Sequence, residues 1–196
     1  MSDAADARIR RIRELLPELQ EIGSEQARIA VERIWERCWA ESAWPDVAVV
    51  PKNGAAARAV AHVPDAWTLV THARTVAQLS LVNAEVLERL HGIHYDRDAL
   101  LVIALLHDVS KLVEYVDDQD GGAEKGEFGE LIQHGVYGAF LMWRHALPLE
   151  WVHAVISHTP SSRVLPKTQE ALIVRYVDFL DTDAMLLDIG DPLHLT

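Results

Sequence analysis

The sequence predicts an all-α fold, and three observations carry this prediction. Apolar residues recur at every third or fourth position over several long segments, which is the spacing of one helix face. Residues 99–106 are all apolar and lie inside a longer segment that reads as a buried helix. Alternating strand patterns are scarce along the chain. We therefore expect a bundle of helices packed around a buried core.

Residues 1–61 are expected to form an N-terminal helical extension. The first apolar period is interrupted by Pro17, which predicts a kink or a new helix at that point. Ser24 can cap a second, longer helix. Residues 44–64 contain several prolines and an Asn-Gly pair, so they are expected to be a loop, with a short extended piece possible at 47–50.

The second helix and its end carry three tryptophans, Trp35, Trp39 and Trp44. They are most simply packing groups, and the alternative is an apolar contact surface between the two subunits of a homodimer. The one cysteine, Cys38, cannot form an internal disulfide and is expected to be a buried helix residue.

A long helix is expected to begin at Asp65, to carry His72 in its first turns and to end at Gly92. Three further helices are expected at about residues 130–146, 148–158 and 167–188. These three helices carry His134, His158 and Asp178.

The chain is expected to be organised around residues 96–115. Asp96 can cap this helix, and the apolar run that follows should be buried on all sides. The sequence then places His107 and Asp108 in this apolar setting, where an unpaired charge is costly, so the two residues must pair locally or hold a metal. Lys111 follows on the same helical face.

Residues 117–129 are acidic and rich in glycine. A flexible surface loop is the simplest interpretation of this segment. The alternative is a lid over a site near Lys111, because loops beside sites often gate them.

Composition narrows the classes of function. A formal net charge of −12 in 196 residues argues against a nucleic-acid polymer as the main partner and leaves a small anionic substrate. No apolar run is long enough to span a membrane and the N-terminus has no signal-peptide core, so we expect a cytoplasmic protein. The chain has ten histidines and one cysteine, so a bound metal would have imidazole and carboxylate ligands. These ligands suit Fe, Mn, Zn, Co or Ni.

Six residues on or near apolar helix faces stand out together: His72, His107, Asp108, His134, His158 and Asp178. Taken singly, His72 or His158 would more often be a hydrogen-bonded core histidine. Apart from the adjacent pair, however, each lies on a different expected helix, so antiparallel packing can bring all six to one level of a bundle.

The order His, His-Asp, His, His, Asp resembles the HD-domain superfamily of metal-dependent phosphohydrolases, over about residues 62–190. The resemblance implies that His72, His107, Asp108 and Asp178 bind one ion. His134 and His158 would bind a second ion, with Asp108 bridging the two. Lys111 completes the HDxxK pattern of several dinuclear branches, where this lysine contacts the substrate or a bound oxygen species.

The resemblance further implies two divalent ions, Fe or Mn before Zn, Co or Ni, with Asp108 and Lys111 as catalytic residues. The first hypothesis is a hydrolase of a small phosphate-bearing compound, a nucleotide or phosphomonoester, with a metal-bridged hydroxide as nucleophile. The second is a mixed-valent di-iron oxygenase that cleaves a C–C or C–P bond. The third is a non-catalytic ligand-binding domain. The Gly-Tyr-Pro and paired His-His motifs of the cyclic-dinucleotide-degrading branch are absent.

Three charged residues near the six candidates have open roles. Asp181 is expected either to be solvated or to support a ligand through a hydrogen bond. Arg74 is expected to point away from the site. Arg175 could reach it, although a solvated surface position is the simpler interpretation for both arginines.

Overall fold

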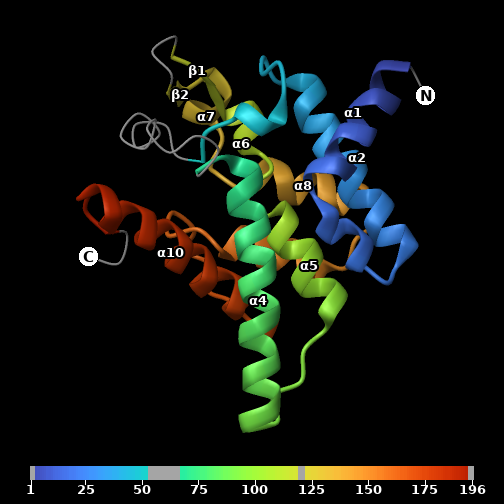
Figure 1. Ribbon diagram of the computed structural model, residues 1–196, viewed down its shortest axis with the longest axis vertical. Helices are drawn as coiled ribbons and strands as arrows, with labels where there is room; N and C mark the ends of the chain where they lie inside the picture. Colours follow the sequence, from blue (N-terminus) through green and yellow to red (C-terminus); the bar gives the residue numbers. More distant parts are fainter. Residues whose placement is uncertain (1–2, 53–66, 119–121, 194–196) are drawn as a thin grey trace.

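The apolar helix α5 (Arg97–Leu106) lies in the middle of the molecule, as the buried sequence pattern predicts, and all its residues from Ala99 to Leu106 are buried. It contacts α2 (Glu25–Glu41), α4 (Leu69–His91), α9 (Leu149–Ser157) and α10 (Gln169–Ile189). In this computed structural model, α1 and α2 lie on one side of the α4–α5 pair and α10 lies on the other (Figure 1). The predicted all-α class is confirmed. The structure describes residues 3–52, 67–118 and 122–193.

The remaining elements are short, apart from α1. They are α1 (Asp3–Leu15), η1 (Pro17–Glu21), η2 (Val47–Val49), α6 (Lys111–Glu114), β1 (Tyr115–Asp117), β2 (Ala123–Lys125), α7 (Glu127–Leu131) and α8 (Val136–Arg144). Strands β1 and β2 form an antiparallel pair in which Val116 lies opposite Glu124. Among the described residues, every helix is too short or too polar to cross a lipid bilayer.

The N-terminal helices share one continuous core with the rest of the chain. Ile12 and Trp35 belong to the same cluster of buried side chains as Leu105 and Val177. The boundary expected between residues 61 and 62 falls outside the described residues.

The three tryptophans of the N-terminal segment, Trp35, Trp39 and Trp44, belong to this core or pack against it. Trp35 is completely buried, and its indole N–H donates to the Leu105 carbonyl at 2.8 Å. Trp44 is also buried, and Trp39 is partly buried. Trp35 and Trp44 are therefore packing groups, as the simpler interpretation predicts, and Cys38 is a buried helix residue as expected.

The long helix begins later than the sequence predicts. It starts at Leu69, because the Thr68 hydroxyl accepts a hydrogen bond from the Thr71 N–H and the Thr71 hydroxyl accepts one from the Thr68 N–H. The residue expected to begin the helix, Asp65, lies outside the described residues. The predicted end is right, since Gly92 closes the helix with φ of 68°, a left-handed conformation that suits glycine.

Residues 96–115 do not form one helix. The α-helical ladder ends at Leu106, and the next turns are tighter, with the Val109 N–H bonded to the Leu106 carbonyl and the Lys111 N–H to the Asp108 carbonyl. Lys111 therefore begins α6, and the three-residue spacing still brings it beside Asp108.

Two further predictions are corrected. The expected helix over 130–146 is divided, because Gly135 has φ of 81° and α8 begins only at Val136, so His134 lies in a turn. Residues 117–129 include β2 and part of α7, so this segment is not simply a loop. The piece at 47–50 is mostly the 3-10 helix η2, followed by a single bridge between Pro51 and Thr68.

Candidate metal centre

Four buried side chains from three parts of the bundle meet in what we term the first ligand group. His72 comes from the first turn of α4, His107 and Asp108 from the turn after α5, and Asp178 from the middle of α10. The Nε2 atoms of His72 and His107 are 3.0 Å apart. His72 Nε2 lies 3.1 Å from Asp178 Oδ1 and 3.3 Å from Asp108 Oδ2.

The second ligand group consists of Asp108, His134 and His158. His134 lies in the turn before α8, and His158 lies at the end of α9. His134 Nε2 is 2.7 Å from Asp108 Oδ1 and 3.3 Å from His158 Nε2. The two oxygens of Asp108 are thus divided, Oδ2 toward the first group and Oδ1 toward the second.

The turn that carries His134 depends on its glycine. A Cβ at Gly135 would lie 3.3 Å from His158 Cε1 and 3.2 Å from the Val155 carbonyl oxygen. A side chain here would need a left-handed backbone and a shift of His158 or of the Val155 carbonyl, so glycine suits this position. The same glycine that ends the predicted helix therefore allows His134 and His158 to approach each other.

The hydrogen bonds of the four imidazoles test whether the site fits metal ions. Nδ1 of His107 and Nδ1 of His158 face the backbone carbonyls of Ala104 and Val155, which can only accept, so both Nδ1 atoms carry the proton. Neutral rings protonated at Nδ1 present bare Nε2 lone pairs to the centre.

His72 and His134 have carboxylate partners at Nδ1. Asp181 lies 2.6 Å from His72 Nδ1, and Glu114 lies 2.7 Å from His134 Nδ1. Carboxylates also face the Nε2 atoms of both rings, so each ring can donate from either nitrogen. When the proton is on Nδ1, the two Nε2 atoms of each ligand group, 3.0 or 3.3 Å apart, are both free to bind a cation. Such an arrangement suits a cation held between the lone pairs, and metal-binding histidines commonly make these outer hydrogen bonds.

The separations between the ligand atoms also fit. Ligands about 2.1 Å from one ion lie about 3.0 Å apart in octahedral and about 3.4 Å apart in tetrahedral coordination. In the first group His107 Nε2 lies 3.5 Å from Asp108 Oδ2 and 3.7 Å from Asp178 Oδ1. In the second group His158 Nε2 lies 3.5 Å from Asp108 Oδ1. Most of these separations lie within about 0.3 Å of the two ideal values, and the 2.7 Å between His134 Nε2 and Asp108 Oδ1 is the length of a hydrogen bond. Small shifts of these side chains would therefore accommodate a small divalent ion in each group.

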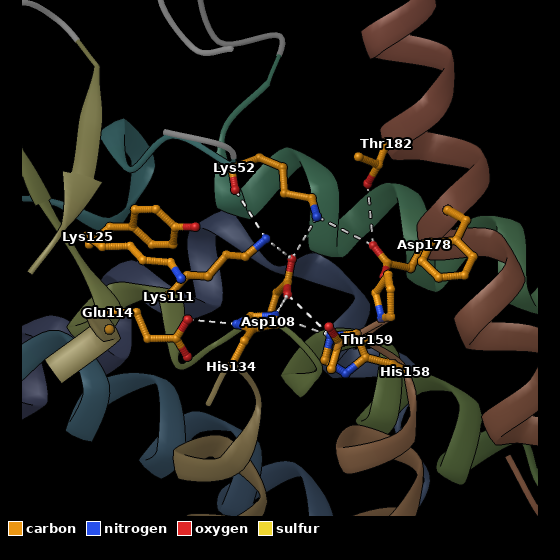
Figure 2. Close-up of a pocket in the computed structure, with 14 residues that line it drawn as sticks. Lys52, Asp108, Lys111, Glu114, Lys125, His134, His158, Thr159, Asp178 and Thr182 are labelled. Carbon is orange, nitrogen blue, oxygen red and sulfur yellow. Dashed lines mark hydrogen bonds and ion pairs between the residues drawn. The ribbon is translucent and has the colours of Figure 1, made fainter. Parts of the chain in front are cut away.

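Two lysines lie against the carboxylates (Figure 2). Lys111 Nζ is 2.7 Å from Asp108 Oδ2, and Lys52 Nζ is 3.0 Å from the same oxygen. Burial would raise the pKa of the Asp108 carboxyl, but the Lys111 and Lys52 ammonium groups outweigh it and hold this pKa well below its usual range. The pKa of Asp178 is likewise held well below its usual range, with Lys52 as the main charge that opposes burial.

The two lysines differ in how firmly they hold their protons. Burial lowers the pKa of Lys111 to about 8. At Lys52, the attraction of Asp108 and Asp178 outweighs burial and raises the pKa. Lys111 is therefore the lysine that can exchange a proton near neutral pH.

Among the imidazoles, burial lowers the pKa of His107. Burial and the Lys52 ammonium also act to lower the pKa of His72, but hydrogen bonds to its carboxylate neighbours leave it raised. Burial is likewise outweighed at His134, whose pKa is raised by hydrogen bonds to Asp108 and Glu114. A proton therefore competes with a metal ion for one ligand of each group, His72 in the first and His134 in the second.

A cavity of about 170 Å³ opens onto the second ligand group. His134 and His158 line it together with three lysines, Lys52, Lys111 and Lys125. Asp108 and Asp178 also line it, whereas His72 and His107 do not. The cavity thus places cationic side chains beside the more open half of the centre.

All six residues singled out from the sequence meet at this centre. Asp181 supports His72 and is not simply solvated, which decides between its two predicted roles. Arg74 pairs with Glu18, away from the site, as expected. Arg175 donates to the backbone carbonyls of Ser157 and Thr159 and is therefore not a solvated surface group.

Sequence reasoning missed Lys52 and Glu114. Glu114 follows Lys111 by three residues in the apolar segment LVEY. An acid in such an apolar setting indicates a buried carboxylate that needs a partner. Lys52 lies in a proline-rich stretch 56 residues before Asp108, and nothing in its local sequence indicates a partner.

Comparison with known proteins identifies the family of the chain. The HD domain family model matches residues 69–183, and the chain belongs to the HD-domain family. A relative, the dihydroneopterin 2′,3′-cyclic phosphate phosphodiesterase of Methanocaldococcus jannaschii, is 31% identical over 123 residues. The match covers 62% of this chain and 48% of the relative, so the chain spans about half the length of that protein. No solved structure matches significantly.

Proposed function

We propose that this protein is a dinuclear metal-dependent hydrolase of a small phosphate ester. The observation that carries the proposal is the position of Asp108, whose Oδ2 belongs to the first ligand group and whose Oδ1 belongs to the second. A carboxylate shared in this way can bridge two ions.

His72, His107, Asp108 and Asp178 would hold one ion, and His134, His158 and Asp108 the other. Imidazole and carboxylate ligands suit iron and manganese, with zinc, cobalt and nickel as alternatives. When bound, two divalent ions supply hydroxide near neutral pH and polarise a phosphoryl oxygen.

The protein's own residues would bind and orient an anionic substrate. The side chains of Lys52, Lys111 and Lys125 line the cavity. Two divalent ions bring a charge of +4 and the two ligand carboxylates −2, so this half of an acidic protein attracts anions locally. Lys111 Nζ is held 2.7 Å from Asp108 Oδ2 at the cavity, and in the metal-free protein burial lowers its pKa to about 8. From this position Lys111 would neutralise charge that develops on the phosphoryl group and donate a proton to a leaving oxygen.

The relative supports a phosphate ester as substrate, because its name describes a phosphodiesterase that acts on a 2′,3′-cyclic phosphate. A small cyclic phosphodiester is therefore the first probe for this chain, followed by nucleotides and other phosphomonoesters. Membership of the HD-domain family also supports hydrolysis of a phosphate ester. The di-iron oxygenase is the alternative that the experiment below distinguishes.

The test begins with anaerobic purification, followed by elemental analysis. We expect about two ions per chain and, after loading with Mn²⁺ or Fe²⁺, hydrolysis of a 2′,3′-cyclic nucleotide or a nucleoside monophosphate without oxygen uptake. The matched control is Asp108→Asn, which should lose the activity. Oxygen consumption without hydrolysis would favour the di-iron oxygenase, and a chain that binds no ion would contradict both.

A further inference from the structure

Lys52 comes from the chain segment before the matched HD-domain region, yet its side chain lies inside the centre. The Lys52 N–H donates to the Trp67 carbonyl at 3.0 Å, and the Leu69 N–H donates to the Val50 carbonyl at 2.8 Å. These bonds fix the backbone beside the start of α4. The Lys52 side chain is 6% exposed, so this lysine is not a surface cation.

The Lys52 ammonium contacts the carboxylates of the first ligand group and no others in the part of the chain that the structure describes. Its Nζ lies 3.0 Å from Asp108 Oδ2 and 3.4 Å from Asp178 Oδ1 (Figure 2). These are the same two oxygen atoms that face His72 Nε2 at 3.3 Å and 3.1 Å. Lys52 therefore bonds to the atoms that would bind the first ion.

Lys111 is placed differently. Its Nζ is bonded to Asp108 and to the Lys52 carbonyl, at 2.7 Å and 3.2 Å, and no ion pair joins it to Asp178 among the described residues. Of the two lysines, only Lys52 connects both carboxylates of the first group.

The formal charges of the two ligand carboxylates and the two lysines balance without a metal: Asp108 and Asp178 carry −2, and Lys52 and Lys111 supply up to +2. The carboxylates of Glu114 and Asp181 bond instead to His134 and His72. Buried carboxylates without partners are strongly destabilising. Without Lys52, Asp178 would lose its nearest fixed positive charge.

We propose that Lys52 is a tethered counter-ion, which stabilises the metal-free centre by bonding Asp108 and Asp178 and which weakens binding of the first ion. The physical reason is that two cations bonded to the same oxygen atoms repel each other, and strongly so in a buried site. Lys52 thus acts through the two carboxylates, as a positioning residue. The inference rests on the proposed metal centre and is independent of the reaction.

Two measurements on four proteins test the proposal: Mn²⁺ titration by calorimetry, and the Tm of the metal-free form. The proteins are wild type, Lys52→Met, Lys52→Arg and a control, Lys167→Met, which changes an exposed lysine. We expect Lys52→Met to bind Mn²⁺ about tenfold more tightly. Its metal-free Tm should fall by about 10 °C, and Mn²⁺ should recover most of that loss.

Lys52→Arg retains the charge and should stay closer to wild type than Lys52→Met in both measurements. The control Lys167→Met should match wild type. Equal or weaker Mn²⁺ binding by Lys52→Met would overturn the proposal, because a merely structural lysine would lower affinity when removed. Wild type that binds no Mn²⁺ would instead overturn the proposed function.

If Lys52→Met does not fold without metal, refolding in Mn²⁺ decides the matter. Recovery of native helix content with Mn²⁺ supports the counter-ion role, since the ion then replaces the missing charge. Failure to fold in both conditions overturns it, because a bound ion could not stand in for Lys52.

Discussion

The two ligand groups share Asp108 but differ in how they are built. The first has four ligands, with His72, His107 and Asp178 all buried, and two of these come from within the long helices α4 and α10. The second has three ligands, and the His134 side chain, which comes from a turn, is 21% exposed at the cavity. A closed four-ligand group suits firm retention of an ion, whereas a three-ligand group beside a cavity leaves positions for substrate.

The largest effect is expected at the shared ligand. Asp108→Ala should remove both ions and lower turnover by about 10³-fold or more, because each group loses a carboxylate oxygen. Elemental analysis measures the ions, and circular dichroism checks that the helices are intact. Asp108→Asn serves as a nearly isosteric companion. Two ions still bound in either variant would refute the bridging role.

Loss of one histidine from each group compares the groups directly. His134→Ala should retain one tightly bound ion, because the first group stays complete. His72→Ala should lose that tight ion and retain only weak binding at the second group. We expect turnover to fall by about 10²-fold in both. Mn²⁺ titration gives stoichiometry and affinity, and identical binding curves for the two variants would remove the distinction between the groups.

Lys111 is expected to affect turnover more than metal content. Lys111→Met should keep two ions but lose about 10²- to 10³-fold in kcat, since it removes a charge and a proton donor beside the reacting phosphate. Lys167→Met is the control, because Lys167 is exposed and does not line the cavity. An unchanged kcat would mean that Lys111 only neutralises Asp108.

The residues that orient the imidazoles should have smaller, separable effects. Asp181→Asn weakens the acceptor of His72 Nδ1 and should lower the affinity of the first ion, whereas Glu114→Gln acts on His134 and the second ion. Loss of such outer hydrogen bonds typically costs about 10- to 100-fold in metal affinity. The same titration resolves the two ions. An effect of Asp181→Asn on the weaker ion alone would contradict this assignment.

Acid should weaken both groups together. The pKa values of His72 and His134 are raised in the metal-free protein, so protonation begins above the usual imidazole range. A ring must be neutral to bind metal, so affinity falls as pH decreases, by about tenfold per pH unit for each proton displaced. Mn²⁺ titrations at pH 8, 7 and 6 measure this dependence. Constant affinity over that range would argue against histidine ligands.

The elements that the sequence predicts wrongly show where local patterns are not informative. The apolar period over 130–146 predicts one helix. The left-handed backbone at Gly135 interrupts that helix, and His134 lies in the turn before α8. The strands β1 and β2 are three residues each, too short for an alternating pattern to be recognised. The sequence favours a packing role for Trp35, but only the position of its neighbours shows that it is completely buried.

The ligand set is the part that residue types and their order indicate by themselves. Histidine and aspartate in apolar settings need partners, and their order resembles the HD-domain family. Six candidate ligands could therefore be named without coordinates: His72, His107, Asp108, His134, His158 and Asp178. The all-α class follows equally from periodicity, because apolar spacing is a local property of the chain.

Only the tertiary structure decided which atoms of these side chains face one another, that Asp108 divides its two oxygens between two groups, and that Lys52 enters the centre from a distant segment. Such contacts join residues far apart in sequence, so they depend on the path of the backbone through the bundle. That path is set by the packing of the whole core, which no short stretch of sequence records.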